Sequence, residues 1–327
     1  MNILIVSSSI IPAHLYGGIE RVIWDLGSEL TKLGHAITYM VNEGSSCSFA
    51  KVLTFDKERS LSEQIPEEID IVHLNYQSSE TFDKPHVVTQ HGNTNDEEYQ
   101  FNRNTIFVSR DHANRHGSNQ FVYNGLNWDA YPKPTLVKDK SYFHFLGKAS
   151  WRLKNVTGAI NIVRAAGEKL TVMGGNRLNL KMGFRFTPYP SVKFAGMVDN
   201  VRKSAIMDSS NGLVFPVRWH EPFGLALTES LYFGCPVIGT PYGSLPELIN
   251  KDVGFLSAKS LELTDAVRNI SQFSVKRCHE YARDIFNSKV MAQSYLQKYE
   301  QVINGSALNE EVPRLKKVQV DKFLPFY

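Results

Sequence analysis

Cysteine is scarce in this chain, which has three in 327 residues. Cys47, Cys235 and Cys278 lie far apart without the spacing of a metal site, and they indicate a reducing compartment rather than a disulfide framework. Long apolar runs and a basic leader are also absent, so we expect neither a signal peptide nor a membrane span. The sequence therefore predicts a cytoplasmic protein with at most peripheral contact with the inner face of a membrane.

An excess of either charge is likewise missing. The formal net charge is +3 at pH 7, and the densest basic run is Arg314-Leu315-Lys316-Lys317. Nucleic acid is therefore excluded as an expected partner, because domains that bind it concentrate positive charge on one face. No Gly-x-Gly-x-x-Gly follows the first apolar run, which removes the dinucleotide fingerprint, and no Asp-x-Asp triplet occurs in the chain.

The chain does contain a repeated alternation of short apolar runs with amphipathic stretches. This alternation is typical of an α/β protein with parallel sheets and helices on both faces, and the length suffices for two cores. Strands are expected at 2–6, 36–41, 69–74, 86–90, 105–108 and 120–123, and then at 142–147, 170–173, 192–194, 212–215 and 236–239. Helices are expected from Ile19 to Leu33 and in three stretches between Leu261 and Ile303.

The most informative segment runs from His220 to Glu229 and places two carboxylates, Glu221 and Glu229, around a Pro-Phe-Gly turn. The helix expected to begin near Gly224 presents unpaired backbone N–H groups and the positive end of its dipole, which favour a diphosphate. Glu229 lies about five residues into that helix, where it can accept hydrogen bonds from hydroxyls such as those of a ribose. Glutamate pairs are common on exposed helices, but the turn and the apolar strand before it favour a sugar-nucleotide site.

Together with the stretch that continues to Ile249, this segment resembles the signature of retaining GT-B glycosyltransferases, in particular the GT4-like family (glycosyl transferases group 1). The resemblance implies an α/β protein of GT-B architecture, with two Rossmann-like, doubly wound domains that face a cleft. We expect an acceptor domain at 1–130, a linker at 131–140, a nucleotide-sugar-binding domain at 141–303 and a tail at 304–327 that docks on the first domain.

Two lysines resemble the cations with which this family holds the donor diphosphate. Lys148 and Lys154 keep the family's six-residue spacing, but Lys148 stands where arginine is usual. Because lysine cannot make the planar bidentate contact of arginine, we favour Lys154 over Lys148 as the phosphate ligand. The alternative is that both are solvated lysines at the start of a helix, although cations there are mildly unfavourable.

Further positions match the family more loosely. Gly17 and Gly18 follow the first strand, at the sheet edge where doubly wound domains bind ligands. His91 ends a strand, where the family places a histidine near the reacting sugar carbon, and His73 competes for that role. Val198 lies on a loop that approaches the base in similar enzymes. The resemblance thus implies His91, Glu221, Lys154 and Lys148 as catalytic residues and Gly17, Gly18, Val198, Phe223, Gly224, Leu225 and Glu229 as donor-binding residues.

The implied activity is transfer of a hexosyl group from a UDP- or GDP-linked sugar to a hydroxyl of a saccharide or lipid-linked acceptor, with retained configuration. The setting would be cell-surface polysaccharide or glycoconjugate synthesis, and neither a metal nor a cofactor is expected. A nucleotide-sugar epimerase of the same architecture stays open, as does a non-catalytic sugar-nucleotide-binding component of an assembly complex. A glycoside hydrolase also uses two carboxylates, but it needs neither the lysine pair nor the helix N-terminus. The donor base and sugar, the acceptor and the oligomeric state remain open.

Overall fold

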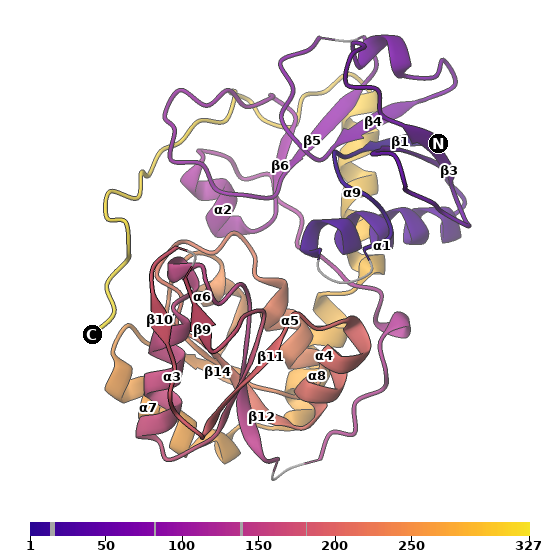
Figure 1. Cartoon of the computed structure of the whole chain (residues 1–327). Helices are drawn as coiled ribbons and strands as arrows, with labels where there is room; N and C mark the ends of the chain where they lie inside the picture. Colours follow the sequence, from indigo (N-terminus) through magenta and orange to yellow (C-terminus); the bar gives the residue numbers. More distant parts are fainter. Residues whose placement is uncertain (14–16, 82, 138–139, 181) are drawn as a thin grey trace. The chain divides into compact units, whose positions relative to one another are not determined.

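The structure is a computed structural model that describes residues 1–13, 17–81, 83–137, 140–180 and 182–327, and it divides into two units (Figure 1). The first unit comprises Met1–Asn127 and Phe286–Val318, and the second comprises Trp128–Ile285 and Gln319–Tyr327. Each unit is built on its own six-stranded parallel sheet. The α/β class with two Rossmann-like units is therefore confirmed.

The first sheet has the strand order β3-β2-β1-β4-β5-β6. Its strands are β1 (Asn2–Val6), β2 (Ala36–Val41), β3 (Lys51–Thr54), β4 (Ile71–Leu74), β5 (His86–Gln90) and β6 (Thr105–Phe107). The helical elements of this unit are α1 (Gly18–Lys32), η1 (Ser62–Gln64), α2 (Arg110–Arg115) and α9 (Ser288–Ile303). The strand expected at 120–123 is wrong, because Phe121 makes only an isolated bridge to Phe107.

Helices α1 and α9 pack on one face of this sheet. His73 of β4 points to that face, where its Nδ1 lies 2.7 Å from the hydroxyl of Tyr299 and its Nε2 lies 2.7 Å from Oγ1 of Thr89. Thr89 in turn lies 2.9 Å from the hydroxyl of Tyr295, and both tyrosines belong to α9. Both ring nitrogens of the buried His73 therefore have partners within the core of the first unit.

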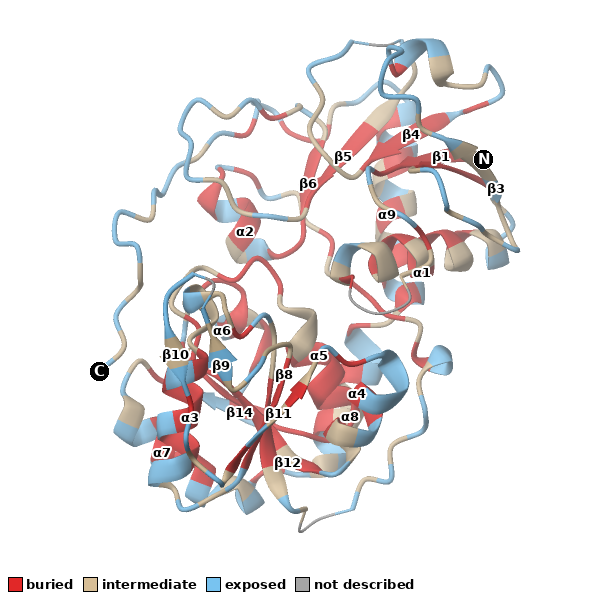
Figure 2. Ribbon diagram, in the orientation of Figure 1, coloured by how far each residue is buried: buried red, intermediate tan, exposed pale blue. Residues whose placement is uncertain are grey.

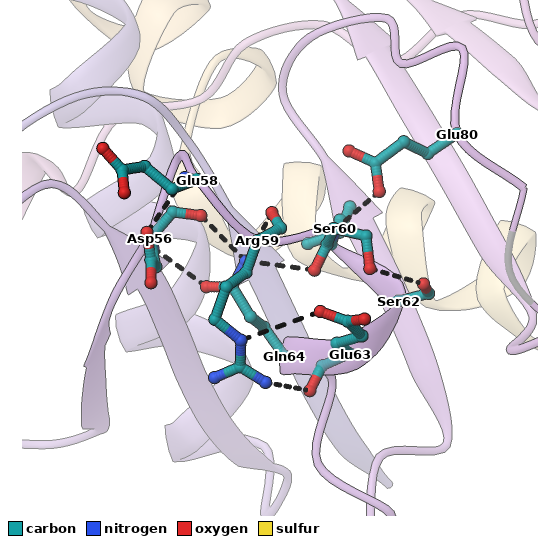
Figure 3. Close-up of polar contacts among 9 residues, drawn as sticks. Asp56, Glu58, Arg59, Ser60, Ser62, Glu63, Gln64 and Glu80 are labelled. Carbon is teal, nitrogen blue, oxygen red and sulfur yellow. Dashed lines mark hydrogen bonds and ion pairs between the residues drawn. The ribbon is translucent and has the colours of Figure 1, made fainter.

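The other face of the first sheet is covered mainly by an irregular segment. Leu61 is fully buried there against Leu4, Val72 and other strand residues. The Gln64 side chain holds the segment together through Asp56, Arg59 and Ser60, and Glu80 accepts from the backbone N–H of Leu61 (Figure 3). Side-chain hydrogen bonds thus replace those of a helix at this position.

The second sheet has the order β11-β8-β7-β12-β13-β14. Its strands are β7 (Tyr142–Leu146), β8 (Leu170–Met173), β11 (Val192–Gly196), β12 (Ser210–Phe215), β13 (Val237–Gly239) and β14 (Gly254–Leu256), with a hairpin of β9 (Leu178–Asn179) and β10 (Arg185–Phe186) outside it. The helical elements are η2 (Trp128–Ala130), η3 (Arg152–Lys154), α3 (Val156–Ala165), α4 (Asn200–Asp208), α5 (Leu225–Tyr232), α6 (Leu245–Leu248), α7 (Ser260–Arg268), η4 (Ile270–Gln272) and α8 (Val275–Ile285). Helices α3 and α7 lie together on one side, and α4, α5 and α8 lie on the other (Figure 1). Buried residues follow the strands and the helix faces that meet them (Figure 2).

The boundaries between the units differ from the expected domains. Trp128 stacks on Tyr232 of α5 with ring centroids 4.3 Å apart, so the chain from Trp128 belongs to the second unit. Residues 138–139 of the expected linker lie outside the described residues. Helix α9, expected in the second domain, belongs to the first because its tyrosines complete that core.

The tail expected to dock on the first domain is shared between the units. The Arg314 backbone N–H donates to the His116 carbonyl of the first unit at 2.9 Å. Residues 319–327 instead belong to the second unit, where Leu324 pairs with Arg218. The apolar end of the tail therefore does not follow the expectation, because its hydrogen-bonding partners lie in the second unit.

Stability is expected to fall in mild acid, because each unit buries a neutral histidine. Burial lowers the pKa of His73 and of His144 from 6.5 to about 3, and His144 lies between the hydroxyls of Ser210 and Ser230. Below pH 6.5 these two histidines become protonated in the unfolded chain, whereas in the folded chain they stay neutral down to about pH 3. The free energy of unfolding therefore decreases across this window as pH falls. Urea denaturation at pH 7.5 and 5.0 measures the loss.

The matched variant for this experiment is His144→Asn, which keeps a polar amide next to Ser210 and does not titrate. It should lose less free energy of unfolding between the two pH values than the unmodified chain. Equal losses in both proteins would show that His144 does not contribute to the pH dependence.

Candidate functional site

The candidate site of the second unit forms where β12 leaves the sheet and α5 begins. The loop between them turns back at Gly224, which has φ +87° and precedes the first residue of α5. This left-handed conformation suits glycine, and the residue offers no side chain to cover the N–H groups of the helix. Phe223 is buried under the turn, whereas Gly224 and Leu225 are partly exposed. The predicted helix start at Gly224 is confirmed.

Lys154 and Glu221 meet beside this loop, although they are far apart in the sequence. The ammonium Nζ of Lys154 lies 2.5 Å from Oε2 of Glu221, and both side chains are mostly buried, at 13% and 7% exposure. The indole N–H of Trp219 donates to the same carboxylate oxygen at 2.8 Å. A buried pair needs such additional hydrogen bonds, because desolvation of two charges is costly.

Three aromatic rings surround the Lys154 ammonium. Its Nζ lies 5.0 Å from the ring centroid of Trp219, 5.2 Å from that of Phe215 and 5.6 Å from that of Trp151. These distances are within the range of cation–π attraction. The rings therefore fix a positive charge next to the Glu221 carboxylate and before the N-terminus of α5.

A neighbouring loop holds the backbone of Glu221 in place. The Ser244 backbone N–H donates to the Glu221 carbonyl at 2.9 Å, and its hydroxyl donates to the Phe223 carbonyl at 2.7 Å. Gly243, with φ +64°, packs so closely that a Cβ there would lie 2.2 Å from the Glu221 nitrogen. The position therefore requires glycine for both its conformation and its closeness.

Glu229 is buried one helical turn into α5, at 2% side-chain exposure. Its Oε1 lies 2.5 Å from Nζ of Lys203 on α4 and accepts from the hydroxyl of Tyr131 at 2.8 Å. Lys203 is itself buried. The two glutamates of the sequence motif are thus each paired with a lysine, and neither is a solvated surface carboxylate.

The other sequence-predicted residues of this unit lie on nearby strand ends. Lys148 is exposed on the loop after β7. Val198 is buried on the loop between β11 and α4, and Asp199 begins α4 by accepting from the Arg202 backbone N–H. The loops that follow β7 and β8 touch each other, because the Ala149 backbone N–H donates to the Gly174 carbonyl at 2.9 Å.

In the first unit, His91 follows β5 and is oriented by Asn75 at the end of β4. The Nε2 of His91 lies 2.9 Å from Oδ1 of Asn75, whose Nδ2 donates to the Val6 carbonyl. Because the amide nitrogen is used by Val6, the amide oxygen accepts from a protonated Nε2 and Nδ1 keeps its lone pair. Burial lowers the pKa of His91 to about 4, so the ring is neutral at pH 7.

Gly17 and Gly18 lie in the same unit, where α1 begins. Arg21 on α1 donates from Nε to the Gly17 carbonyl at 3.0 Å. Ser9, on the loop after β1, donates to Oε1 of Glu20 at 3.1 Å. A Cβ at Gly17 would lie 2.5 Å from the Glu20 carboxylate. The Gly-Gly-Ile-Glu-Arg sequence therefore forms the start of α1, and Glu20 joins it to the loop after β1.

The described part of the chain contains neither a metal-type cluster of side chains nor a membrane-spanning helix. Among those residues, no three or more His, Cys, Asp or Glu side chains gather in a way that could hold a metal ion. No helix found there combines the length and apolar character that crossing a membrane requires.

Residues 128–285 match the family model described as "Glycosyl transferases group 1". The matched range is the continuous part of the second unit, which carries the paired glutamates. This part of the chain is therefore similar to group 1 glycosyl transferases.

Two curated proteins are similar in sequence to part of this chain. An uncharacterised 41.2 kDa protein in the cps region of Klebsiella pneumoniae is 29% identical over 198 residues, which are 54% of either chain. D-rhamnosyltransferase WbpZ of Pseudomonas aeruginosa is 26% identical over 142 residues, or 38% of this chain and 36% of its own. The chain thus matches about half, or less, of the length of these curated relatives.

Solved structures of similar fold cover nearly the whole chain. AviGT4, a glycosyltransferase involved in Avilamycin A biosynthesis, has a TM-score of 0.76 at 18% identity, over 93% of this chain and 98% of its own. Anabaena HepE, solved in complex with UDP-glucose, has a TM-score of 0.64 at 16% identity, over 92% and 100%. The fold is therefore that of GT-B glycosyltransferases, as the sequence resemblance implied.

Several residues that touch the candidate site residues were not predicted from the sequence, among them Trp219, Asn75 and Tyr131. Trp219 stands two positions before Glu221 and donates to its carboxylate. Trp151 lies in the other predicted site segment, before Lys154, so a tryptophan in each segment was the sequence signal for these contacts. Asn75 ends β4 directly after a buried run, as His91 follows β5. Tyr131 was assigned to the linker, and only the folded chain shows its bond to Glu229.

Proposed function

We propose that this chain transfers a hexosyl group from a nucleotide diphosphate sugar to a hydroxyl of a saccharide or lipid-linked acceptor, with retained configuration. The observation that carries the proposal is the Lys154–Glu221 pair at 2.5 Å beside the N-terminus of α5. A cation, open helix N–H groups and a carboxylate acceptor are together what a diphosphate joined to a sugar requires. The setting we propose is cell-surface polysaccharide or glycoconjugate synthesis in the cytoplasm.

Each residue has a distinct role in this proposal. As the bond between the sugar carbon and the diphosphate breaks, the diphosphate leaves with the electron pair, and Lys154 and the α5 amides stabilise its charge. Lys148 is exposed and can add a second positive charge. Glu221 accepts hydrogen bonds from sugar hydroxyls, and Glu229 accepts them from the ribose. The protein would need no metal for this charge stabilisation.

The remaining predicted residues complete the donor site in the proposal. Phe223, Gly224 and Leu225 present the turn and the first amides of α5, and Val198 contacts the base through its backbone. His91 contacts the donor sugar as a neutral ring, and Gly17 and Gly18 contribute backbone amides of the first unit. Two similar proteins support the substrate class, since HepE was solved with UDP-glucose and WbpZ is a D-rhamnosyltransferase.

Differential scanning fluorimetry with UDP, GDP, ADP and their common sugars tests the donor site. A ligand that binds only the folded chain, present at a hundred times its Kd, stabilises by about 2.7 kcal/mol. For a unit of this size we expect one nucleotide to raise Tm by on the order of 5 °C. Glu229→Gln should remove most of that shift, because the amide accepts fewer hydrogen bonds and offers no charge to Lys203.

The control is Glu280→Gln, which removes a half-exposed carboxylate paired with Lys276 on α8. It should keep the full nucleotide shift. An equal shift in both variants would contradict the role of Glu229, and no shift with any nucleotide would overturn the donor site. Sugar-nucleotide conversion without an added acceptor would identify the chain as an epimerase instead.

A further inference from the structure

Residues 319–327 belong to the second unit and are bonded to it at several points (Figure 1, yellow trace ending at C). The Leu324 backbone N–H donates to the Arg218 carbonyl at 2.9 Å, and Nε of Arg218 donates back to the Leu324 carbonyl at 2.8 Å. The Tyr242 hydroxyl donates to the Pro325 carbonyl at 2.6 Å. Reciprocal bonds of this kind fix a segment in register and are not typical of a loosely packed chain end.

Phe323 lies against two guanidinium groups. The central carbon of Arg152 is 5.1 Å from its ring centroid, and that of Arg218 is 5.3 Å away. Both distances are within the cation–π range. The ring therefore neighbours two like charges that belong to different loops and would otherwise only repel each other.

Those two loops carry the charged pair of the candidate site. Arg152 stands two residues before Lys154, and Arg218 stands three residues before Glu221. The loops also bond directly, because the Arg218 backbone N–H donates to the Leu153 carbonyl at 2.7 Å. A shift of Arg152 would therefore move Lys154, and a shift of Arg218 would move Glu221, because only a few backbone residues separate the members of each pair.

The third contact reaches Glu221 from its other side. Tyr242, which donates to Pro325, directly precedes Gly243 and Ser244. Gly243 packs on the Glu221 backbone, and the Ser244 backbone N–H donates to the Glu221 carbonyl. Residues 323–325 thus touch both loops that determine where the Glu221 carboxylate lies.

We propose that residues 323–325 form a strap that holds Lys154 and Glu221 at their contact distance, with Phe323 as a positioning residue. The strap acts through Arg152, Arg218 and Tyr242. Its effect on catalysis rests on the proposed function, but its effect on the geometry of the pair does not.

Fluorine NMR of the chain labelled with 5-fluorotryptophan tests the strap directly. The chain has four tryptophans, of which Trp151 and Trp219 lie around Lys154, whereas Trp24 packs on Phe49 and Trp128 on Tyr232. Substitution of each tryptophan by phenylalanine assigns the four signals. Phe323→Ala should shift or broaden the signals of Trp151 and Trp219 and leave the other two unchanged.

Val320→Ala is the matched control, since Val320 lies in the same segment with its side chain 91% exposed. It should leave all four signals in place. The strap is overturned if Phe323→Ala leaves the Trp151 and Trp219 signals unchanged, or if Val320→Ala moves them equally. Phe323→Leu keeps an apolar side chain without the ring, and its signals should move because the guanidinium contacts are lost.

Kinetics with the donor nucleotide sugar extend the test to catalysis. Phe323→Ala should lower kcat/KM by roughly ten- to a hundredfold, as expected for a reacting pair displaced by less than an ångström or so. The thermal midpoint should fall little, because the replaced ring is half-buried at the surface. If the unmodified chain shows no transfer, the proposed function fails and the fluorine signals still decide whether the strap positions the pair.

Discussion

Lys154→Met is expected to abolish sugar transfer and also to destabilise the second unit. Removal of the ammonium leaves the buried Glu221 carboxylate with Trp219 as its remaining donor. Loss of one partner of a buried pair costs about 3–5 kcal/mol, and loss of a charge that stabilises a leaving group costs roughly a hundredfold or more in kcat. Methionine suits the space between three aromatic rings. Urea denaturation and a donor-turnover assay measure the two effects separately.

The double variant Lys154→Met with Glu221→Gln separates charge from packing. Both charges are then gone, and the Trp219 N–H still has an amide oxygen to donate to. The free energy of unfolding should recover most of the loss, whereas transfer should stay as low as in the single variant. If the double variant is no more stable than Lys154→Met alone, the loss does not come from an unpaired carboxylate.

Gly243→Ala is expected to be the most damaging single-methyl substitution near the site. Gly243 has φ +64°, and a Cβ there would lie 2.2 Å from the nitrogen and 2.4 Å from the oxygen of Glu221, both of them backbone atoms. The backbone must therefore move, and Glu221 moves with it. We expect a loss of at least about 3 kcal/mol in unfolding free energy and loss of transfer beyond roughly a hundredfold.

Gly167→Ala separates backbone strain from the clash. Gly167 lies in the same unit and has φ +81°. No neighbouring atom of the described residues lies within 4 Å of the position that a Cβ would take there. Only the left-handed strain of about 1–2 kcal/mol remains there, and turnover should not change. Similar losses of stability in the two variants would mean that the contact of Gly243 with Glu221 does not constrain the loop.

The sequence predicted the central strands well because their residues are buried on both faces. β1, β2, β5 and β8 have the predicted bounds, as expected for continuous apolar runs. β3 was missed because this edge strand is half exposed and carries no such run. The irregular segment around Leu61 was missed because its structure depends on side-chain hydrogen bonds of Gln64, which leave no periodic signal.

Periodicity also could not assign α9 to a unit. Its apolar positions predicted a helix, but an amphipathic stripe does not specify which sheet it covers. That assignment depends on Tyr295 and Tyr299 meeting Thr89 and His73. In the same way, the motif placed Glu221 and Lys154 near a common ligand, while their direct contact through the Trp219 indole depends on tertiary packing.

The discontinuous first unit has a consequence for the order in which a nascent chain can fold. By the time Asn127 has left the ribosome, all six strands of the first sheet have been made, but α9 has not. His73 then lacks the Tyr299 hydroxyl, and the sheet face that α9 covers is open to water. The intervening unit, complete as a core by Ile285, can fold first. The first unit is thus synthesised first but can complete its core only after α9 has been made. Its uncovered sheet would need protection during synthesis.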